Sequence, residues 1–218
     1  MRHIVRGVVA AALGVVALDA SALNVDFLGF GHGSQTVSYS LTAPNAVKSG
    51  SASAGGFLTS VNGGPSFETY CVDLYQTINF ADPAYPNYTL VTGAAHAFSN
   101  PNANLDLGRL YAEGHTVNTA VTEAAFQMAI WEIAYETSGS YDLAHGSAIF
   151  SGTSGASTLA TSWLAGLGSA ASAGVLVLEN REHQDVIYAP VPEPETYALM
   201  AAGLFAMGFV ARRQRPRR

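Results

Sequence analysis

Two apolar, arginine-bearing ends bracket an acidic central segment, and this division most constrains what the chain can fold into. Residues 23–190 contain three basic and thirteen acidic residues, a formal charge of −10, whereas the whole 218-residue chain carries −6. Ends of this kind are typical of export and sorting signals rather than of a folded core. The central segment of about 168 residues is therefore expected to form one domain.

Residues 1–22 have the three parts of a secretory signal. Arg2 and Arg6 give a positive start, a run of twelve apolar residues follows, and small residues stand at the end. As a helix, twelve residues rise about 18 Å, which is too short to span a hydrocarbon layer of about 30 Å. We therefore expect a signal helix that signal peptidase removes between Ala22 and Leu23.

The other end combines a proline-rich linker, an apolar stretch and a basic tail. Pro192-Glu193-Pro194 cannot continue a regular helix or strand, residues 197–211 are apolar, and five arginines follow. Fifteen residues rise about 22 Å as a helix, which suffices for spanning only if the arginines snorkel. Basic residues behind the stretch favour a cytoplasmic tail. This pattern predicts a short transmembrane helix that acts as a stop-transfer segment, with residues 23–190 outside the inner membrane.

These three linked elements closely resemble the PEP-CTERM sorting signal of Gram-negative bacteria. In that family an exosortase recognises and removes the tail, and the host genomes usually also encode extracellular polysaccharide synthesis. The resemblance covers residues 191–218. It implies an exported protein that is anchored in the inner membrane before processing and then reaches the cell surface or the extracellular matrix. A plain C-terminal anchor is the alternative.

Several stretches of the central segment have the pattern of β-strands. Residues 35–41 alternate in polarity between Gly- and Ser-rich turns, and residues 67–80 form a longer run of β-branched and aromatic residues. Two short apolar runs, 175–178 and 185–188, flank a polar turn and predict a late hairpin.

One longer segment has the pattern of a helix. Residues 119–136 contain neither Gly nor Pro, Asn118 or Thr119 can cap their start, and apolar side chains occupy most of the circumference. We expect a buried helix there and a shorter helix at about 105–112. The predicted fold class is α+β, mainly a β-sandwich or barrel-like domain with these two inserted helices, plus the N-terminal signal helix and the short C-terminal transmembrane helix.

Composition excludes several classes of function. The acidic central segment excludes a general nucleic-acid binder, and the single cysteine excludes a disulfide scaffold and a Cys-cluster zinc site. No metal or other cofactor is expected, because the candidate ligands have no recognisable spacing; they are Asp73, His96, His115 and Asp142.

Two residues are unusual for an exported domain. Cys71 is the only thiol, so it is a buried inert residue, an intermolecular link or a protected reactive group. Gln127 lies in the middle of the apolar helix, where its amide costs a few kcal/mol unless it is satisfied. A hydrogen bond to a neighbouring strand would satisfy the amide. Alternatively, the sulfur of Cys71 could displace ammonia from Gln127 and form an internal thioester, which a dry pocket would protect from water.

Residues 67–150 resemble the surface thioester domains of bacteria. Tyr70-Cys71-Val72 looks like their aromatic–Cys–hydrophobic motif, and residues 126–131 (FQMAIW) look like their Gln-x-Ala-Ile-Trp motif, with Phe126 where threonine is usual. The resemblance implies that Cys71 is the sulfur donor and Gln127 the acyl donor. The expected pocket residues are Tyr70, Val72, Asp73, Phe126, Ile130 and Trp131, with Asp73 on the same strand face as Cys71.

The functional hypothesis is therefore an exosortase-sorted surface or matrix protein that attaches once, covalently, to an amine or hydroxyl of a matrix or surface partner. It would not be an enzyme. The alternative is a passive structural protein associated with exopolysaccharide. A cysteine hydrolase would need a histidine beside Cys71, from His96, His115, His145 or His183, and no local signature joins them. Glu132 and Glu136 are expected on the solvated side of the helix.

Overall fold

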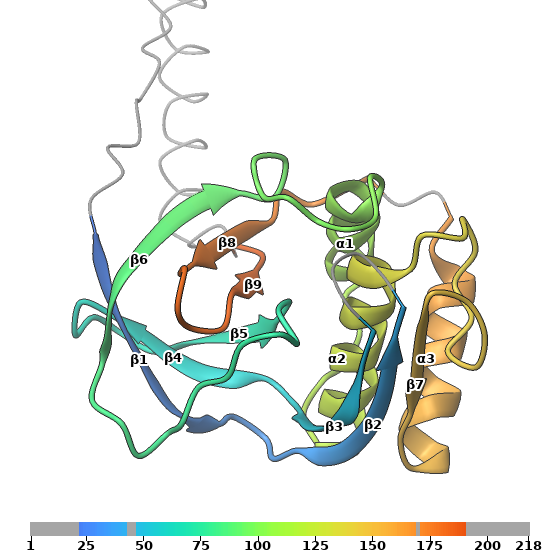
Figure 1. Cartoon of the computed structure of the whole chain (residues 1–218), viewed down its shortest axis with the longest axis horizontal. Helices are drawn as coiled ribbons and strands as arrows, with labels where there is room; N and C mark the ends of the chain where they lie inside the picture. Colours follow the sequence, from blue (N-terminus) through green and yellow to red (C-terminus); the bar gives the residue numbers. More distant parts are fainter. Residues whose placement is uncertain (1–21, 43–46, 169–170, 191–218) are drawn as a thin grey trace, which may run out of the picture.

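Six antiparallel strands close into a barrel in the computed structural model of the chain, which describes residues 22–42, 47–168 and 171–190 (Figure 1). Around the barrel, the strands are β1 (Leu23–Phe30), β4 (Phe57–Val61), β5 (Phe67–Cys71), β9 (Val186–Tyr188), β8 (Leu176–Glu179) and β6 (Tyr85–Thr92). Closure pairs every strand on both sides, so the barrel has no exposed edge strand. The predicted barrel-like layer is confirmed.

A second sheet and three helices stand beside the barrel (Figure 1). The sheet has the order β3-β2-β7, and all its pairs are antiparallel. Its strands are β3 (Lys48–Ala54), β2 (Gln35–Leu41) and β7 (Ala148–Ser151), and the helices are α1 (Ala103–Ala112), α2 (Ala120–Tyr135) and α3 (Ser154–Gly166).

Helix α2 is the centre of the molecule. It packs against β5 of the barrel, against all three strands of the second sheet and against α1 and α3. Thirteen of its sixteen residues are buried. Thr119 caps its start: its hydroxyl accepts from the Thr122 N–H, and its own N–H donates to the Thr122 hydroxyl. The predicted buried helix is confirmed, and so is the shorter helix before it.

The expected long strand over 67–80 is wrong in its second half, because β5 ends at Cys71. Beyond that point the backbone leaves the barrel: Leu74 N–H donates to the Tyr135 hydroxyl at 2.8 Å, and Tyr75 N–H donates to the Asp73 carboxylate at 2.7 Å. These side-chain acceptors replace strand pairing and form a turn. The late hairpin is confirmed by the pairing of β8 with β9.

Helix α3 was not predicted, because its sequence is rich in Gly, Ser and Thr. Its buried residues, Ala156, Ala160 and Leu164, are four positions apart and form a narrow stripe on one face.

The expected signal helix, the sorting motif and the expected transmembrane helix lie outside the described residues. Within residues 22–42, 47–168 and 171–190, no helix has the length and apolar character needed to cross a bilayer. Ala22 is exposed, and β1 begins at the next residue, Leu23. The prediction that signal peptidase cleaves at this junction stays a prediction.

Candidate functional site: Cys71, Gln127 and a carboxylate–histidine cluster

The side chain of Gln127 lies directly against the backbone of Cys71. The Cys71 N–H donates to Gln127 Oε1 at 3.0 Å, and Gln127 Nε2 donates to the Cys71 carbonyl at 2.8 Å. Both residues are buried, with exposed fractions of 1% for Cys71 and 0% for Gln127. Two residues 56 positions apart in the sequence are therefore held together by paired hydrogen bonds.

The strand pairing of the barrel explains why the backbone N–H and carbonyl of Cys71 are available to the Gln127 amide. The pairing between β4 and β5 reaches only from Thr59↔Phe67 to Phe57↔Thr69, so β4 does not extend to Cys71. On its other side Cys71 lies opposite Val186 of β9. The Gln127 amide takes the place of the missing strand and satisfies two buried backbone groups that would otherwise lack partners.

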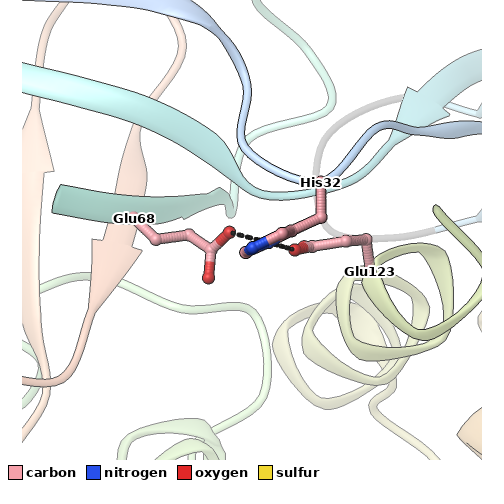
Figure 2. A group of neighbouring side chains, drawn as sticks. All are labelled: His32, Glu68 and Glu123. Atoms are coloured by element: carbon pink, nitrogen blue, oxygen red, sulfur yellow. Dashed lines mark hydrogen bonds and ion pairs between the residues drawn. The ribbon is translucent and has the colours of Figure 1, made fainter. Parts of the chain in front are cut away.

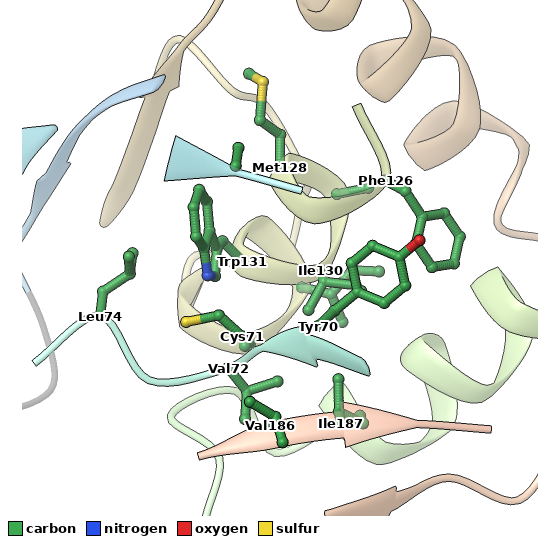
Figure 3. Packing of buried hydrophobic residues seen from close by; sticks show 14 of the residues in the cluster. Tyr70, Cys71, Val72, Leu74, Phe126, Met128, Ile130, Trp131, Val186 and Ile187 are labelled. Carbon is green, nitrogen blue, oxygen red and sulfur yellow. The ribbon is translucent and has the colours of Figure 1, made fainter. Parts of the chain in front are cut away.

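The thiol of Cys71 lies among apolar side chains next to Trp131 (Figure 3). Its Sγ donates to the Asp73 carbonyl at 3.2 Å. Burial raises the pKa of the Cys71 thiol well above its usual value, and the indole N–H of Trp131 opposes that shift only in part. The sulfur is consequently held as a protonated, weakly nucleophilic thiol.

Five of the six expected pocket residues are buried around this pair; they are Tyr70, Val72, Phe126, Ile130 and Trp131. Tyr70 and Phe126 form an edge-to-face pair with ring centroids 4.9 Å apart, so the two motifs contact each other through their aromatic residues as well (Figure 3).

Asp73 differs from its expected position. It lies beyond the end of β5 in the turn, so the placement on the same strand face as Cys71 is wrong. Its carboxylate accepts from the Tyr75 N–H, and its carbonyl accepts from Cys71 Sγ and from Gln184 Nε2 at 2.9 Å. Asp73 therefore fixes the turn that follows Cys71.

A cavity of about 280 Å³ reaches the Cys71 side of the pair. Its lining includes Tyr39, Lys48, Leu74 and Trp131 besides Cys71. Lys48, the chain's only lysine, donates to the Leu74 carbonyl at 2.6 Å and lies over the Tyr75 ring. The cavity therefore opens on the sulfur side of the pair.

The four histidines considered for a hydrolase interact with groups other than Cys71. His96 contacts Glu179 at 2.5 Å, His115 contacts Glu113 at 2.8 Å and His145 contacts Asp142 at 2.9 Å. His183 packs on the Tyr85 ring. The hydrogen bond of the Cys71 sulfur goes instead to a backbone carbonyl.

The expectation that Glu132 and Glu136 face solvent is wrong, because both are buried. Burial raises the pKa of Glu132 to about 8, and Glu132 Oε1 accepts from the Asp142 N–H at 2.7 Å. Burial also opposes ionisation of Glu136, but hydrogen bonds from residues 138, 147 and 148 outweigh it and lower its pKa. The two carboxyl groups anchor the loop between α2 and β7.

A second cluster lies one helical turn away from Gln127 and was not found from the sequence (Figure 2). It joins His32 from the loop after β1, Glu68 from β5 and Glu123 from the first turn of α2. The hydrogen bond to Glu123 raises the pKa of His32. Burial and then the adjacent Glu123 carboxylate raise the pKa of Glu68 to about 7. No spacing signal links these residues, since they come from three separate elements.

Comparison with known proteins identifies the tail. Residues 190–215 match the PEP-CTERM protein-sorting motif. This motif implies a protein that is exported, processed by an exosortase and sorted to the cell surface. Searches of curated proteins and of solved structures found no match to the chain. The comparisons give no support to the resemblance of residues 67–150 to surface thioester domains.

Proposed function

We propose that the barrel domain is an exosortase-sorted surface module in which Cys71 and Gln127 form an internal thioester for one covalent attachment. The observation that carries the proposal is the contact between the two residues. Paired hydrogen bonds of 3.0 and 2.8 Å hold the Gln127 amide on the Cys71 backbone, inside a buried apolar site.

The bond-forming step balances within the two side chains, and the protonated thiol of Cys71 has to give up its proton as it reacts. The Cys71 sulfur attacks the Gln127 amide carbon, a carbon–sulfur bond forms, and the thiol proton leaves with the amide nitrogen as ammonia. The Cys71 N–H already donates to Oε1, where negative charge develops during the attack, so it would act as an oxyanion donor. The surrounding apolar side chains would slow hydrolysis of the product by excluding water.

Attachment would then consume the thioester. An amine or hydroxyl of a matrix or surface partner attacks the carbonyl carbon, the carbon–sulfur bond breaks, and the sulfur takes up the proton of the nucleophile. The partner stays bonded to the Gln127 carbonyl. The cavity lined by Cys71 and Trp131 reaches the sulfur side of this bond from outside. One molecule reacts once, so the proposal describes a linker without turnover.

The same geometry also supports a second candidate, the passive surface protein. Unreacted Gln127 already fills the place of the missing strand beside Cys71, and its amide needs no further partner. In that case Gln127 closes the barrel sheet and Cys71 is an inert core residue.

The first prediction separates these two candidates by intact-mass spectrometry of the exported protein. A thioester lowers the mass by one ammonia, because condensation expels the amide nitrogen. Methylamine should then add to the protein and release a thiol that can be alkylated after unfolding. Gln127→Glu, which keeps the size of the side chain but has no amide nitrogen, should show no deficit, and Cys71→Ala should show none either.

One competing bond needs its own control. An amide between Lys48 and Gln127 would also expel ammonia, but it would not react with methylamine. Lys48→Met should therefore keep both the mass deficit and the methylamine adduct. A wild-type protein with full mass and an alkylatable thiol would refute the thioester and leave the passive role.

A further inference from the structure

The cluster of His32, Glu68 and Glu123 brings three metal-ligating side chains together at the junction of the barrel and α2 (Figure 2). His32 Nδ1 lies 2.8 Å from Glu123 Oε1 and 3.6 Å from Glu68 Oε1. One donor atom from each residue lies within 4.8 Å of the other two. An imidazole and two carboxylates therefore converge on one small volume.

The surrounding protein orients the Glu123 carboxylate. Its Oε2 accepts from the Gly56 N–H and from the Tyr70 hydroxyl, each at 2.9 Å, while Oε1 faces His32. Glu123 is fully buried. A carboxylate with one oxygen held by protein donors and the other directed at an imidazole has the outer-shell support usual for metal ligands.

Two glycines provide the space that the two carboxylates occupy. A Cβ on Gly56 would lie 2.6 Å from Glu68 Oε1 and 2.8 Å from Glu123 Oε2. A Cβ on Gly31 would lie 2.9 Å from Glu68 Oε1. Any larger residue at either position would push into the carboxylate oxygens, so the backbone is shaped to fit the cluster.

The charges of the cluster suit a bound cation. Two carboxylates face one imidazole, and one of the two, Glu123, has no exposed surface. The described residues hold only three Lys or Arg side chains. Lys48 donates to the Leu74 carbonyl and Arg109 pairs with Asp106, so these two are engaged elsewhere. Buried carboxylates are stable when they are paired or bind a metal ion.

We propose that His32, Glu68 and Glu123 bind one divalent transition-metal cation of the Zn²⁺ type. A mixed imidazole and carboxylate set suits such ions better than Ca²⁺ or Mg²⁺, which prefer oxygen ligands alone. Zinc bonds of about 2.0–2.1 Å place tetrahedral donors about 3.3 Å apart. The observed 2.8 and 3.6 Å separations from His32 bracket that value. The carboxylate oxygens of Glu68 and Glu123 lie within 4.8 Å of each other, so the partly exposed Glu68 side chain would also move toward the ion.

The cation would enter from solvent and join separate elements. The side chains of His32 and Glu68 are 49% and 32% exposed, which leaves an open side for entry and for a bound water. The ligands come from the β1–β2 loop, from β5 and from α2. The site does not depend on the proposed thioester, because neither Cys71 nor Gln127 is a ligand.

The second prediction is zinc binding, measured by titration calorimetry on the purified exported protein after dialysis against a chelator. We expect one Zn²⁺ per chain, with Ca²⁺ and Mg²⁺ binding more weakly. His32→Ala and Glu68→Gln should each lower the zinc affinity at least about tenfold. Both positions are partly exposed, so the variants should fold, and circular dichroism checks this.

Two control variants define the site. His145→Ala removes an exposed imidazole that pairs with Asp142 far from the cluster, and it should bind zinc like the wild type. Cys71→Ala should also bind normally, which excludes chelation by the thiol. The proposal is overturned if the wild type binds no zinc, if His32→Ala binds as tightly as the wild type, or if Ca²⁺ binds more tightly than Zn²⁺.

Discussion

At the scale of single residues, the buried polar side chains of α2 define the chemistry of the domain. Glu123, Gln127 and Glu132 are all fully buried. Each has a partner on a different segment: Glu123 meets the barrel, Gln127 meets Cys71, and Glu132 meets the loop after the helix. A polar residue in such an environment must be satisfied, neutral or ion-bound. Gln127 is satisfied by the Cys71 backbone, Glu132 is kept protonated by its raised pKa, and Glu123 belongs to the proposed cation site.

The third prediction concerns the pH dependence caused by Glu132. Its pKa is raised from 4.5 to about 8 in the folded state, so the folded protein keeps a proton that the unfolded chain releases. The free energy of unfolding therefore falls as the pH rises through that window, by up to about 1.4 kcal/mol per pH unit for this group. Glu132→Gln, which cannot ionise, should remove this contribution.

Urea unfolding at several pH values measures the effect. Glu132→Gln should gain stability relative to the wild type between pH 5 and pH 8, while below the unfolded pKa the two should differ little. If the two curves run parallel over this range, Glu132 is ionised in the folded protein and the assignment is wrong.

The sequence alone pointed to some of these residues as unusual, but it gave the wrong environment for others. Gln127 and Cys71 stood out because an amide in an apolar helix and a lone exported thiol are unusual. The environments of Glu132 and Glu136 were misjudged, since i,i+4 glutamates look like an exposed face until the loop that covers them is known. His32 gave no signal, because its partner Glu123 lies 91 residues away.

At the scale of elements, the sequence predicted α2 well and α3 not at all. A long apolar run without Gly or Pro predicts a buried helix even when the tertiary structure is not known. The Gly- and Ser-rich sequence of α3 has weak intrinsic helix propensity, so that helix depends on packing against α2. The end of β5 at Cys71 was likewise set partly by a tertiary contact, the hydrogen bond from the Leu74 N–H to the Tyr135 hydroxyl, together with the local turn that Asp73 forms.

The fourth prediction tests a close approach in α1. Gly108 lies within the helix, where glycine costs about 1 kcal/mol relative to alanine. A Cβ there would come 2.3 Å from the carbonyl oxygen of Ala173. Ala173 is held in this place because its N–H donates to the Gly108 carbonyl at 2.9 Å. Gly108→Ala should therefore destabilise the protein by about 1–2 kcal/mol, because the clash outweighs the gain in helix propensity.

A matched control lies at the end of α3. A Cβ on Gly166 would meet nothing closer than the Glu113 carboxylate at 3.9 Å, so Gly166→Ala should be neutral or stabilise by up to about 1 kcal/mol. Urea unfolding of both variants measures the difference. Equal stability changes in the two variants would show that segment 171–174 is not packed against α1 as described.

At the scale of the whole molecule, the barrel depends on contacts between distant parts of the chain. β8 and β9 come last in the sequence but lie between β5 and β6, so the final strands complete the ring. Sequence patterns predicted β2, the position of β5 and the hairpin of β8 and β9, but they predicted neither β6 and β7 nor the strand order. The order of the strands around the barrel depends on which buried faces pack together, and the packing of the whole domain determines these contacts.

The fifth prediction follows from this closure. A chain that ends at residue 190 retains every described strand and should unfold cooperatively on heating. A chain that ends at residue 174 loses β8 and β9, leaves β5 and β6 without partners on one side, and should show no cooperative transition. Circular dichroism during heating compares them. A cooperative transition in the shorter chain at the same temperature would mean that the ring need not close.

The position of Lys48 limits which molecules can supply an amine to the proposed thioester. The chain has no other lysine, and this ammonium is held by a backbone carbonyl and a tyrosine ring. The only other amine of a copy of the folded domain is the one at its N-terminus, so one copy presents few amines to another. An acyl group stored at Gln127 could be passed to an amine, but identical molecules would offer few amines to accept it. For attachment through an amine, mixed assemblies would then be favoured over chains of identical copies, with the partner supplying the amine.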